Sequence, residues 1–235
     1  MIVVGLSGKA RTGKSRLTSE LFNAAEKMGW DVAVAPFAGP LKREAAANGY
    51  GKVVNPDKYR EYCQEHGAAM RAKDPDHWVK LWYKDILGLK KEEKEMSRPL
   101  LVLIDDCRYN NEIGIINKYG GIVAFVKHGK REIEDPKGAW RKHESEKIAN
   151  TFESVNDVDI KQCGYDYVIH NDGSTDNLTT WANNFINKVC IMEDCICEAC
   201  TSSVENRKAD PRIIDNELRD LLDQIEDLDD DHEDH

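Results

Sequence analysis

The sequence predicts an α/β fold, a five-stranded parallel sheet flanked by helices, and two observations support it. A glycine-rich stretch at residues 8–15 lies between an apolar run, residues 1–6, and a segment with helical spacing, which predicts a strand, a tight loop and a helix. Four more short apolar runs alternate with helical segments along residues 31–189. Strands that alternate with helices are typical of parallel sheets with right-handed crossover connections.

The composition narrows the classes of function. No run of 18 apolar residues occurs, so we expect no membrane-spanning helix. Residues 201–235 hold 13 of the 43 acidic and 4 of the 33 basic residues, so most of the net charge of −10 belongs to them and the first 200 residues are almost neutral. That balance argues against a body that binds a nucleic-acid polymer. Seven cysteines and no export signal predict a reduced, cytoplasmic protein.

The glycine-rich stretch is the strongest chemical signal in the chain. Its glycines let backbone N–H groups turn toward a polyphosphate, and the following helix presents the positive end of its dipole to the same anion. We expect Lys14 to reach the β- and γ-phosphates and the Ser15 hydroxyl to ligate Mg²⁺. The stretch has the spacing of a Walker A loop: Gly8, Lys9, Ala10, Arg11, Thr12, Gly13, Lys14 and Ser15.

The first half of the chain continues with helices around one short strand. Gly29 ends the helix of residues 15–28 as a C′ glycine, and residues 31–36 form the second strand. A turn at 37–42 leads into an alanine-rich helix at 43–48, followed by a loop at 49–56. The helical pattern of residues 57–87 is broken near 73–75, and the charge run at 90–98 predicts a surface connection.

The second half of the chain predicts the other three strands. Residues 100–104 are a continuous apolar run, typical of a strand buried on both faces, which we expect to stop at Asp105. A helix at 111–119, a strand at 122–127, a polar stretch at 128–150, a strand at 165–170 and a helix at 178–189 follow. Because the carboxyl ends of parallel strands line the ligand crevice, we expect Asp105, Asp106 and Arg108 to face the loop.

Charged residues outside the loop are the remaining candidates, because phosphoryl transfer depends on alignment and on screening of charge. For each arginine a solvated surface role is the alternative, and Arg108, just beyond a buried strand, is the best placed. Asp105 and Asp106 either act on Mg²⁺ through water or on an acceptor, or pair structurally with Arg108, and both readings stay open. The candidate cations are Arg11, Lys14, Arg60, Arg71, Arg108, Arg131 and Arg141.

Seven short motifs occur in a fixed order over about residues 1–190. They are Gly8 to Ser15; Phe37-Ala38-Gly39-Pro40-Leu41-Lys42; Arg60 with Gln64 and Gly67; Asp76-His77-Trp78-Val79-Lys80-Leu81; Asp106-Cys107-Arg108 with Asn111 and Glu112; His143-Glu144-Ser145-Glu146; and Asn171-Asp172-Gly173-Ser174. Their order resembles that in the deoxynucleoside monophosphate kinases of T-even and other tailed bacteriophages. Each motif is weak alone, but the ordered set is more specific than the loop.

The resemblance implies an adenylate-kinase-like P-loop fold over residues 1–190, with an acceptor-binding region at 37–88 and a lid at 128–150. It implies phosphoryl transfer from ATP, with Mg²⁺, to a deoxynucleoside 5′-monophosphate by a homodimer in the host cytoplasm. The implied catalytic residues are Lys14, Arg108 and Arg141, and the implied ATP ligands beyond the loop are Arg131, Asn171 and Gly173, the last two bordering the adenine. The implied acceptor ligands are Lys42, Arg60, Gln64, Trp78, Asp106, Arg108 and Glu112.

The chain departs from the family in two places. The segment between Asn48 and Asp57 is short for an acceptor-side insertion, so the preferred base stays open, and the residues from Cys190 onward have no counterpart. Four cysteines there, Cys190, Cys195, Cys197 and Cys200, form either a Zn²⁺ site or free thiols, and the cramped spacing favours thiols. A short heptad seam over 210–228 predicts a helix that packs on the body, on a second copy or on a partner protein.

Three functions are consistent with these patterns. The leading one is a deoxynucleoside monophosphate kinase. The second is a P-loop kinase for another small metabolite, and the third is a nucleotide-binding regulatory module that acts through its C-terminal segment.

Overall fold

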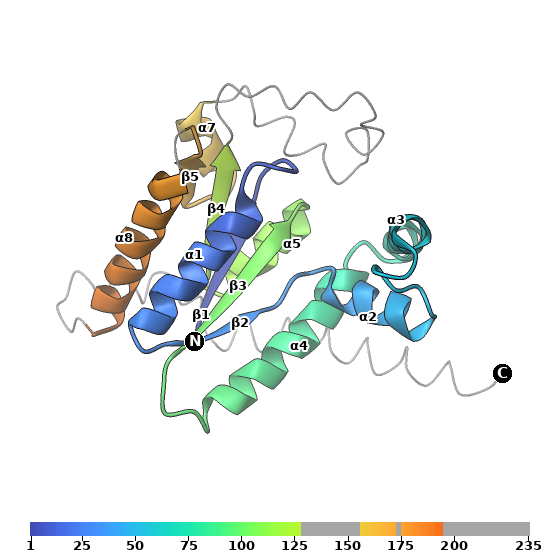
Figure 1. The fold of residues 1–235 in the computed structure, drawn as a ribbon, viewed down its shortest axis with the longest axis horizontal. Coiled ribbons are helices and arrows are strands. Elements are labelled where there is room, and N and C mark those ends of the chain that lie inside the picture. Colours follow the sequence, from blue (N-terminus) through green and yellow to red (C-terminus); the bar gives the residue numbers. More distant parts are fainter. Residues whose placement is uncertain (128–155, 173–174, 195–235) are drawn as a thin grey trace. The chain divides into compact units, whose positions relative to one another are not determined.

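The computed structural model describes residues 1–127, 156–172 and 175–194 (Figure 1). The chain divides into two compact units: unit 1 holds Met1–Val34 and the described residues from Glu93 onward, and unit 2 holds Ala35–Glu92. Unit 1 carries the sheet, and unit 2 is built from helices. Among the helices of the described residues, none is both long and apolar enough to cross a membrane.

The sheet confirms the predicted fold class. In the described part of the chain it has five strands: β1 (Ile2–Ser7), β2 (Asp31–Val34), β3 (Leu100–Cys107), β4 (Ile122–Lys127) and β5 (Tyr167–His170). Their order is β2-β3-β1-β4-β5, and every neighbouring pair is parallel. Because β1 is central, the loop that follows it leaves from the middle of the carboxyl edge of the sheet.

Helices cover both faces of this sheet (Figure 1). On one face, α1 (Lys14–Lys27) and α8 (Thr175–Asp194) share a core with the strands, and this core includes Leu21, Phe185 and Leu103. On the other face lies α5 (Asn110–Lys118), and a Cβ added at Gly5 would come within 2.6 Å of the Ile116 side chain. Burial on both faces explains why the strands are continuous apolar runs.

The end of α1 is formed by backbone hydrogen bonds around a glycine, as predicted. Gly29 has a positive φ of 81°. The N–H of Trp30 donates to the carbonyl of Ala25, five residues earlier, at 3.0 Å, which is the hydrogen bond that defines a Schellman motif. Arg98 donates to the carbonyls of Gly29 and Trp30. The guanidinium therefore satisfies carbonyls at the turn that leads into β2.

Unit 2 contains α2 (Gly39–Ala47), α3 (Pro56–Lys73) and α4 (His77–Glu93), the last residue of α4 belonging to unit 1. Trp82 is fully buried, its ring centroid lies 4.5 Å from that of Phe37, and its indole N–H donates to the carbonyl of Ala35. Trp78 is also buried and donates to the carbonyl of Gly67. Two tryptophans of α4 thus tie together the segment before α2 and the middle of α3.

Several predicted boundaries were wrong, each for a physical reason. Helix α2 begins at Gly39 instead of 43, because Pro40 suits the first turn of a helix. Helix α4 continues into the charge run of residues 90–98 and ends at Glu93, since lysine and glutamate are good helix formers. Strand β3 continues past Asp105 to Cys107, because Ser7 of β1 still pairs with Cys107. The short helix α7 (Asp157–Gln162) was not predicted.

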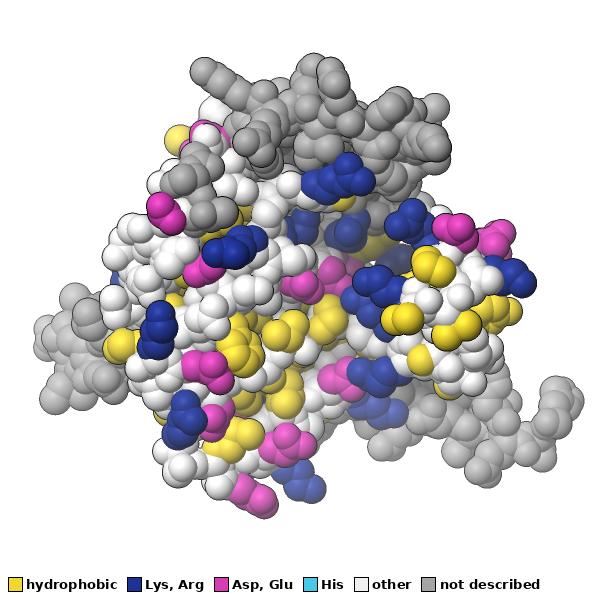
Figure 2. Space-filling view, viewed as in Figure 1, with side chains coloured by type: hydrophobic (Ala, Val, Ile, Leu, Met, Phe, Trp, Pro, Cys, Tyr) yellow, Lys and Arg dark blue, Asp and Glu magenta, His cyan; other side chains and the backbone are white. Residues whose placement is uncertain are grey.

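Charges on the surface are mixed, in agreement with the near-neutral composition of the first 200 residues. Over the face that α1 covers, basic and acidic side chains are interspersed (Figure 2). One such pair is Arg16 with Glu20, at 2.6 Å on successive turns of α1.

Candidate phosphate-binding site

The loop between β1 and α1 adopts a backbone that needs its glycines. Gly8 and Gly13 have φ values of 132° and 101°, in the region that favours glycine. A Cβ at Gly8 would also lie 2.3 Å from the carbonyl oxygen of Val126 on β4, which leaves no room for a side chain. Arg11 also has a positive φ, of 66°. It is the third residue of the loop with a positive φ, and unlike Gly8 and Gly13 it carries a side chain that disfavours this conformation.

Lys14 lies across this loop. It is the first residue of α1, is only 8 % exposed, and its Nζ donates to the carbonyls of Gly8 and Lys9, both at 2.6 Å. The ammonium group is therefore held against the loop by backbone acceptors before any ligand arrives. This is the position from which the sequence predicts contact with the β- and γ-phosphates.

The start of α1 favours an anion. Its first turn contains no acidic residue, and its first amide groups lie at the positive end of the helix dipole. Ser15, the second residue of the helix, is exposed, while Thr12 is buried with its hydroxyl donating to the carbonyl of Lys9 at 2.9 Å. Of the two hydroxyls, Ser15 is therefore the one open to a ligand.

The oxygen ligands that the sequence predicts for Mg²⁺ are too few to hold the ion alone, so the substrate phosphates would have to supply further ligands. A serine hydroxyl and carboxylates such as Asp105 supply hard oxygen ligands, the kind that Mg²⁺ prefers. Among the described residues no group of three or more histidine, cysteine or acidic side chains gathers as a metal site. That Ser15 ligates the ion, with Asp105 contributing through water, stays a prediction.

Arg108 follows β3 beside the loop. Because Ser7 pairs with Cys107, Arg108 comes at the level of the sheet where β1 enters the loop at Gly8. Glu112 is 3 % exposed, and its Oε2 accepts from the N–H groups of Arg108 at 2.6 Å and Tyr109 at 3.0 Å. This is half of a capping box at the start of α5. Glu112, predicted as an acceptor ligand, thus fixes the backbone that carries Arg108.

A pair of buried hydroxyl groups lies at the end of β1, and the sequence did not predict this pair. The hydroxyl oxygens of Ser7 and Tyr165 are 3.3 Å apart, and both side chains are buried. Burial raises the pKa of Tyr165 to about 12. No local sequence signal marks this pair, because the two residues are brought together only by the sheet order.

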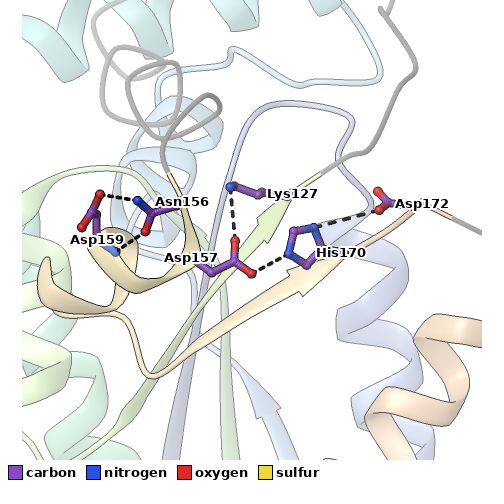
Figure 3. Close-up of polar contacts among 6 residues, drawn as sticks. All are labelled: Lys127, Asn156, Asp157, Asp159, His170 and Asp172. Atoms are coloured by element: carbon purple, nitrogen blue, oxygen red, sulfur yellow. Dashed lines mark hydrogen bonds and ion pairs between the residues drawn. The ribbon is translucent and has the colours of Figure 1, made fainter.

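The end of β5 also reaches the loop. The side chain of Asn171 donates to the carbonyl of Thr12 at 2.9 Å, a contact that the sequence did not predict. The same strand end carries an ion-pair network, in which Asp157 accepts from Lys127 at 3.3 Å and from His170 at 2.7 Å (Figure 3). The hydrogen bond from His170 lowers the pKa of Asp157, although burial opposes the shift.

In unit 2 the predicted acceptor ligands lie in different environments. Lys42 and Arg60 are exposed, Gln64 is half-buried, and Trp78 is part of the core of the unit. Arg71, which the sequence left between a surface and a site role, donates to the carbonyl of Gly67 at 3.0 Å. The acceptor roles of Lys42, Arg60, Gln64 and Trp78 stay predictions.

Some predicted site residues lie outside the described part of the chain. These are Arg131 and Arg141 in the predicted lid at 128–150, Gly173, the side chain of Cys190, Cys195, Cys197, Cys200 and the predicted helix at 210–228.

The comparisons with known proteins show no family for this chain. No protein family model matches the chain, and no curated protein matches it. A solved structure described as the crystal structure of APE1195 covers 80 % of this chain and 95 % of its own, at 18 % identity and a TM-score of 0.39. A shikimate kinase from Acinetobacter baumannii, in complex with shikimate, covers 82 % and 92 %, at 13 % identity and a TM-score of 0.37. The fold class therefore rests on the strand order and the loop geometry themselves.

Proposed function

We propose that this chain is a phosphotransferase that moves the γ-phosphoryl group of ATP to a deoxynucleoside 5′-monophosphate, forming ADP and the deoxynucleoside diphosphate. The observation that carries the proposal is the phosphate loop, in which Lys14 is held by the carbonyls of Gly8 and Lys9 at the start of α1. Loops of this kind also occur in motors and switches. The ordered motifs and the position of Arg108 favour a kinase with a small acceptor.

The loop binds the donor in this proposal. Backbone N–H groups of residues 8–15 and the N-terminus of α1 surround the phosphates, and the Lys14 ammonium screens the charge on the β- and γ-phosphates. Mg²⁺, held by Ser15 and the phosphates, would supply further charge neutralisation. Little covalent chemistry is asked of the protein, because preorganised positive charge does most of the work in phosphoryl transfer.

The neighbouring strand end holds the acceptor in this proposal. Arg108 binds the acceptor phosphate, and its backbone is fixed by Glu112. An oxygen of that phosphate forms the new bond to the γ-phosphorus, while the bond from the γ-phosphorus to the bridging β-phosphate oxygen breaks and ADP leaves. Asp106 lies beside the acceptor.

An ADP-release assay tests the proposal. The protein is incubated with ATP, Mg²⁺ and each of the four common deoxynucleoside monophosphates, and ADP formation is coupled to a spectroscopic readout. We expect turnover with at least one acceptor and none with Lys14→Ala. No turnover with any of the four would sink the deoxynucleotide assignment, and turnover with a small non-nucleotide acceptor instead would favour the metabolite kinase.

We also propose that the active form is a homodimer and that the segment after α8 is dispensable for catalysis. Light scattering measures the first point. For the second, the chain is ended at Asp194, the last residue of α8, and ADP release is compared with that of the full chain. Loss of a protein partner with full retention of turnover would assign the segment to recruitment.

A further inference from the structure

Asn171 is held in place by its neighbours on the sheet. It is the first residue after β5, and its backbone N–H donates to the carbonyl of Lys127 on β4 at 2.8 Å. Its side-chain Nδ2 donates to the carbonyl of Thr12 at 2.9 Å, across a sequence separation of 159 residues. One residue thus connects the end of β4, the end of β5 and the phosphate loop.

The loop is shaped to receive this side chain. A Cβ at Gly13 would lie 2.5 Å from Asn171 Nδ2, so the glycine that closes the loop also leaves room for the asparagine. Thr12 is buried, and both its backbone N–H, at 3.4 Å, and its hydroxyl, at 2.9 Å, turn to the carbonyl of Lys9. The Thr12 carbonyl therefore belongs to a tight turn, and it accepts from outside that turn.

The contact sets the direction of the next amide group. In a trans peptide the C=O of one residue and the N–H of the next point in opposite directions. Because the Thr12 carbonyl points to Asn171, the N–H of Gly13 points away from it. Arg11, directly before Thr12, has a strained positive φ of 66°. The backbone preferences of the loop residues alone therefore do not maintain the orientation of the peptide group between Thr12 and Gly13.

The strand end that carries Asn171 is itself stabilised. His170 donates to Asp157 at 2.7 Å and lies 4.0 Å from Asp172, and Lys127 donates to Asp157 at 3.3 Å (Figure 3). His170 also pairs with Lys127 in the sheet. The N-terminal turn of α7 thus joins the ends of β4 and β5, and His170 directly precedes the asparagine in the chain.

We propose that Asn171 is a positioning residue for the phosphate loop: its amide holds the Thr12 carbonyl outward so that the N–H of Gly13 is aimed at a bound phosphate. This rests on the proposed function, in which the loop binds ATP. It differs from a contact with the base, because Asn171 acts through the loop backbone.

The test compares two asparagines that make the same kind of hydrogen bond. Asn117 on α5 donates through Nδ2 to the carbonyl of Gly164, also at 2.9 Å. We expect Asn171→Ala to weaken binding of ATP and ADP about five- to tenfold, the effect of one lost hydrogen bond, and Asn117→Ala to leave it within about twofold. Both variants should show a similar fall in melting temperature. Equal nucleotide affinity in Asn171→Ala and the wild type would overturn the proposal.

A second measurement separates this inference from the proposed function. Amide hydrogen exchange of residues 8–15 is followed in the nucleotide-free protein, where we expect faster exchange in Asn171→Ala and wild-type exchange in Asn117→Ala. If the wild type binds no ATP, the proposed function fails, and loop exchange alone decides: faster exchange supports the positioning role, and unchanged exchange overturns it. If Asn171→Ala does not fold, Asn171→Ser is measured in the same way.

Discussion

The phosphate-loop edge of unit 1 and the helical surface of unit 2 hold their polar side chains in different ways. In unit 1, Lys14 and Glu112 are 8 % and 3 % exposed, and they bond to backbone groups. In unit 2, Arg43 pairs with Asp85 at 2.7 Å, and their side chains are 63 % and 36 % exposed. A buried group that loses its partner costs about 1–3 kcal/mol, whereas an exposed ion pair contributes about 0–1 kcal/mol.

The polar side chains at the phosphate-loop edge are held in fixed positions, whereas those on the surface of unit 2 are exposed to solvent and less constrained. The groups of unit 1 are fixed by the backbone of the sheet and the loop, so they belong to the fold and to the candidate site together. The side chains on the surface of unit 2 can change with little effect on stability. We therefore expect substitutions at the loop edge to act on phosphoryl transfer and substitutions on unit 2 to act on the choice of acceptor.

The largest effect is expected at Lys14. Removing its ammonium takes away a preorganised charge at the transferred group, so Lys14→Ala should lower turnover by about a hundredfold or more. Circular dichroism should show the same secondary structure, because the sheet does not depend on the ammonium. The matched control is Lys27→Ala at the exposed end of the same helix, for which we expect wild-type turnover. Near-normal turnover in Lys14→Ala would remove the loop from the site.

Arg108 should come next. A lost charge-assisted contact to the acceptor phosphate predicts a fall in kcat/KM for the acceptor of about ten- to a hundredfold in Arg108→Ala, with the KM for ATP little changed. Arg16→Ala, which removes an exposed arginine of α1 paired with Glu20, serves as the control. Normal acceptor kinetics in the Arg108 variant would take that residue out of the site.

The pH dependence of the free energy of unfolding tests the buried polar groups of unit 1, with Tyr165 as the example. Burial raises its pKa to about 12, so the tyrosine contributes stability that is fully present below its ordinary pKa of about 10 and is lost as the pH rises toward 12. At pH 11 the loss is about 1.4 kcal/mol relative to pH 9. Urea unfolding at the two pH values should show a smaller fall for Tyr165→Phe than for the wild type.

The control for this experiment comes from unit 2. The hydroxyl of Tyr62 accepts from Asn48, and burial raises the pKa of this tyrosine as well, but the group lies near the surface, where solvent screens its charge. Tyr62→Phe should therefore remove less of the base dependence than Tyr165→Phe does. If Tyr165→Phe kept the wild-type dependence, the base-sensitive group would lie elsewhere.

Arg60 carries the smallest expected effect. Because its side chain is exposed on α3, Arg60→Ala should not change the melting temperature. We expect the KM for the acceptor to rise about three- to tenfold with kcat nearly unchanged, the pattern of a contact made equally in the ground and transition states. Lys58→Ala, two residues away on the same helix, is the control. A fall in kcat of about tenfold or more in Arg60→Ala would contradict the division between the two units.

The fold was largely predictable because its main signals are local. Doubly buried parallel strands appear as continuous apolar runs, and the glycines of the loop and of the α1 end mark backbone conformations that other residues rarely adopt. These signals predicted all five strands, the loop and the Gly29 turn. Helix α7 was missed because six residues are too few to show a helical period.

The site was predictable in part for the same reason. The spacing of the loop predicted a phosphate-binding role for Lys14, which stays a prediction, and the structure shows its ammonium bonded to the carbonyls of Gly8 and Lys9. The buried capping role of Glu112 was hidden, because the residue at the start of the cap is Tyr109 and not the serine or threonine that marks a capping box. The contacts of Asn171 with Thr12 and of Tyr165 with Ser7 depend on strand order across more than 150 residues, which no local pattern encodes.

The most direct test of phosphoryl transfer at the loop uses ATP labelled in its γ-phosphate. The protein, Mg²⁺ and a deoxynucleoside monophosphate are incubated together, and the labelled products are separated. With the wild type we expect the label in the deoxynucleoside diphosphate. With Lys14→Ala we expect the label in neither the deoxynucleoside diphosphate nor inorganic phosphate. Label that appears only as inorganic phosphate with every acceptor, or equal transfer by the two proteins, would contradict the account.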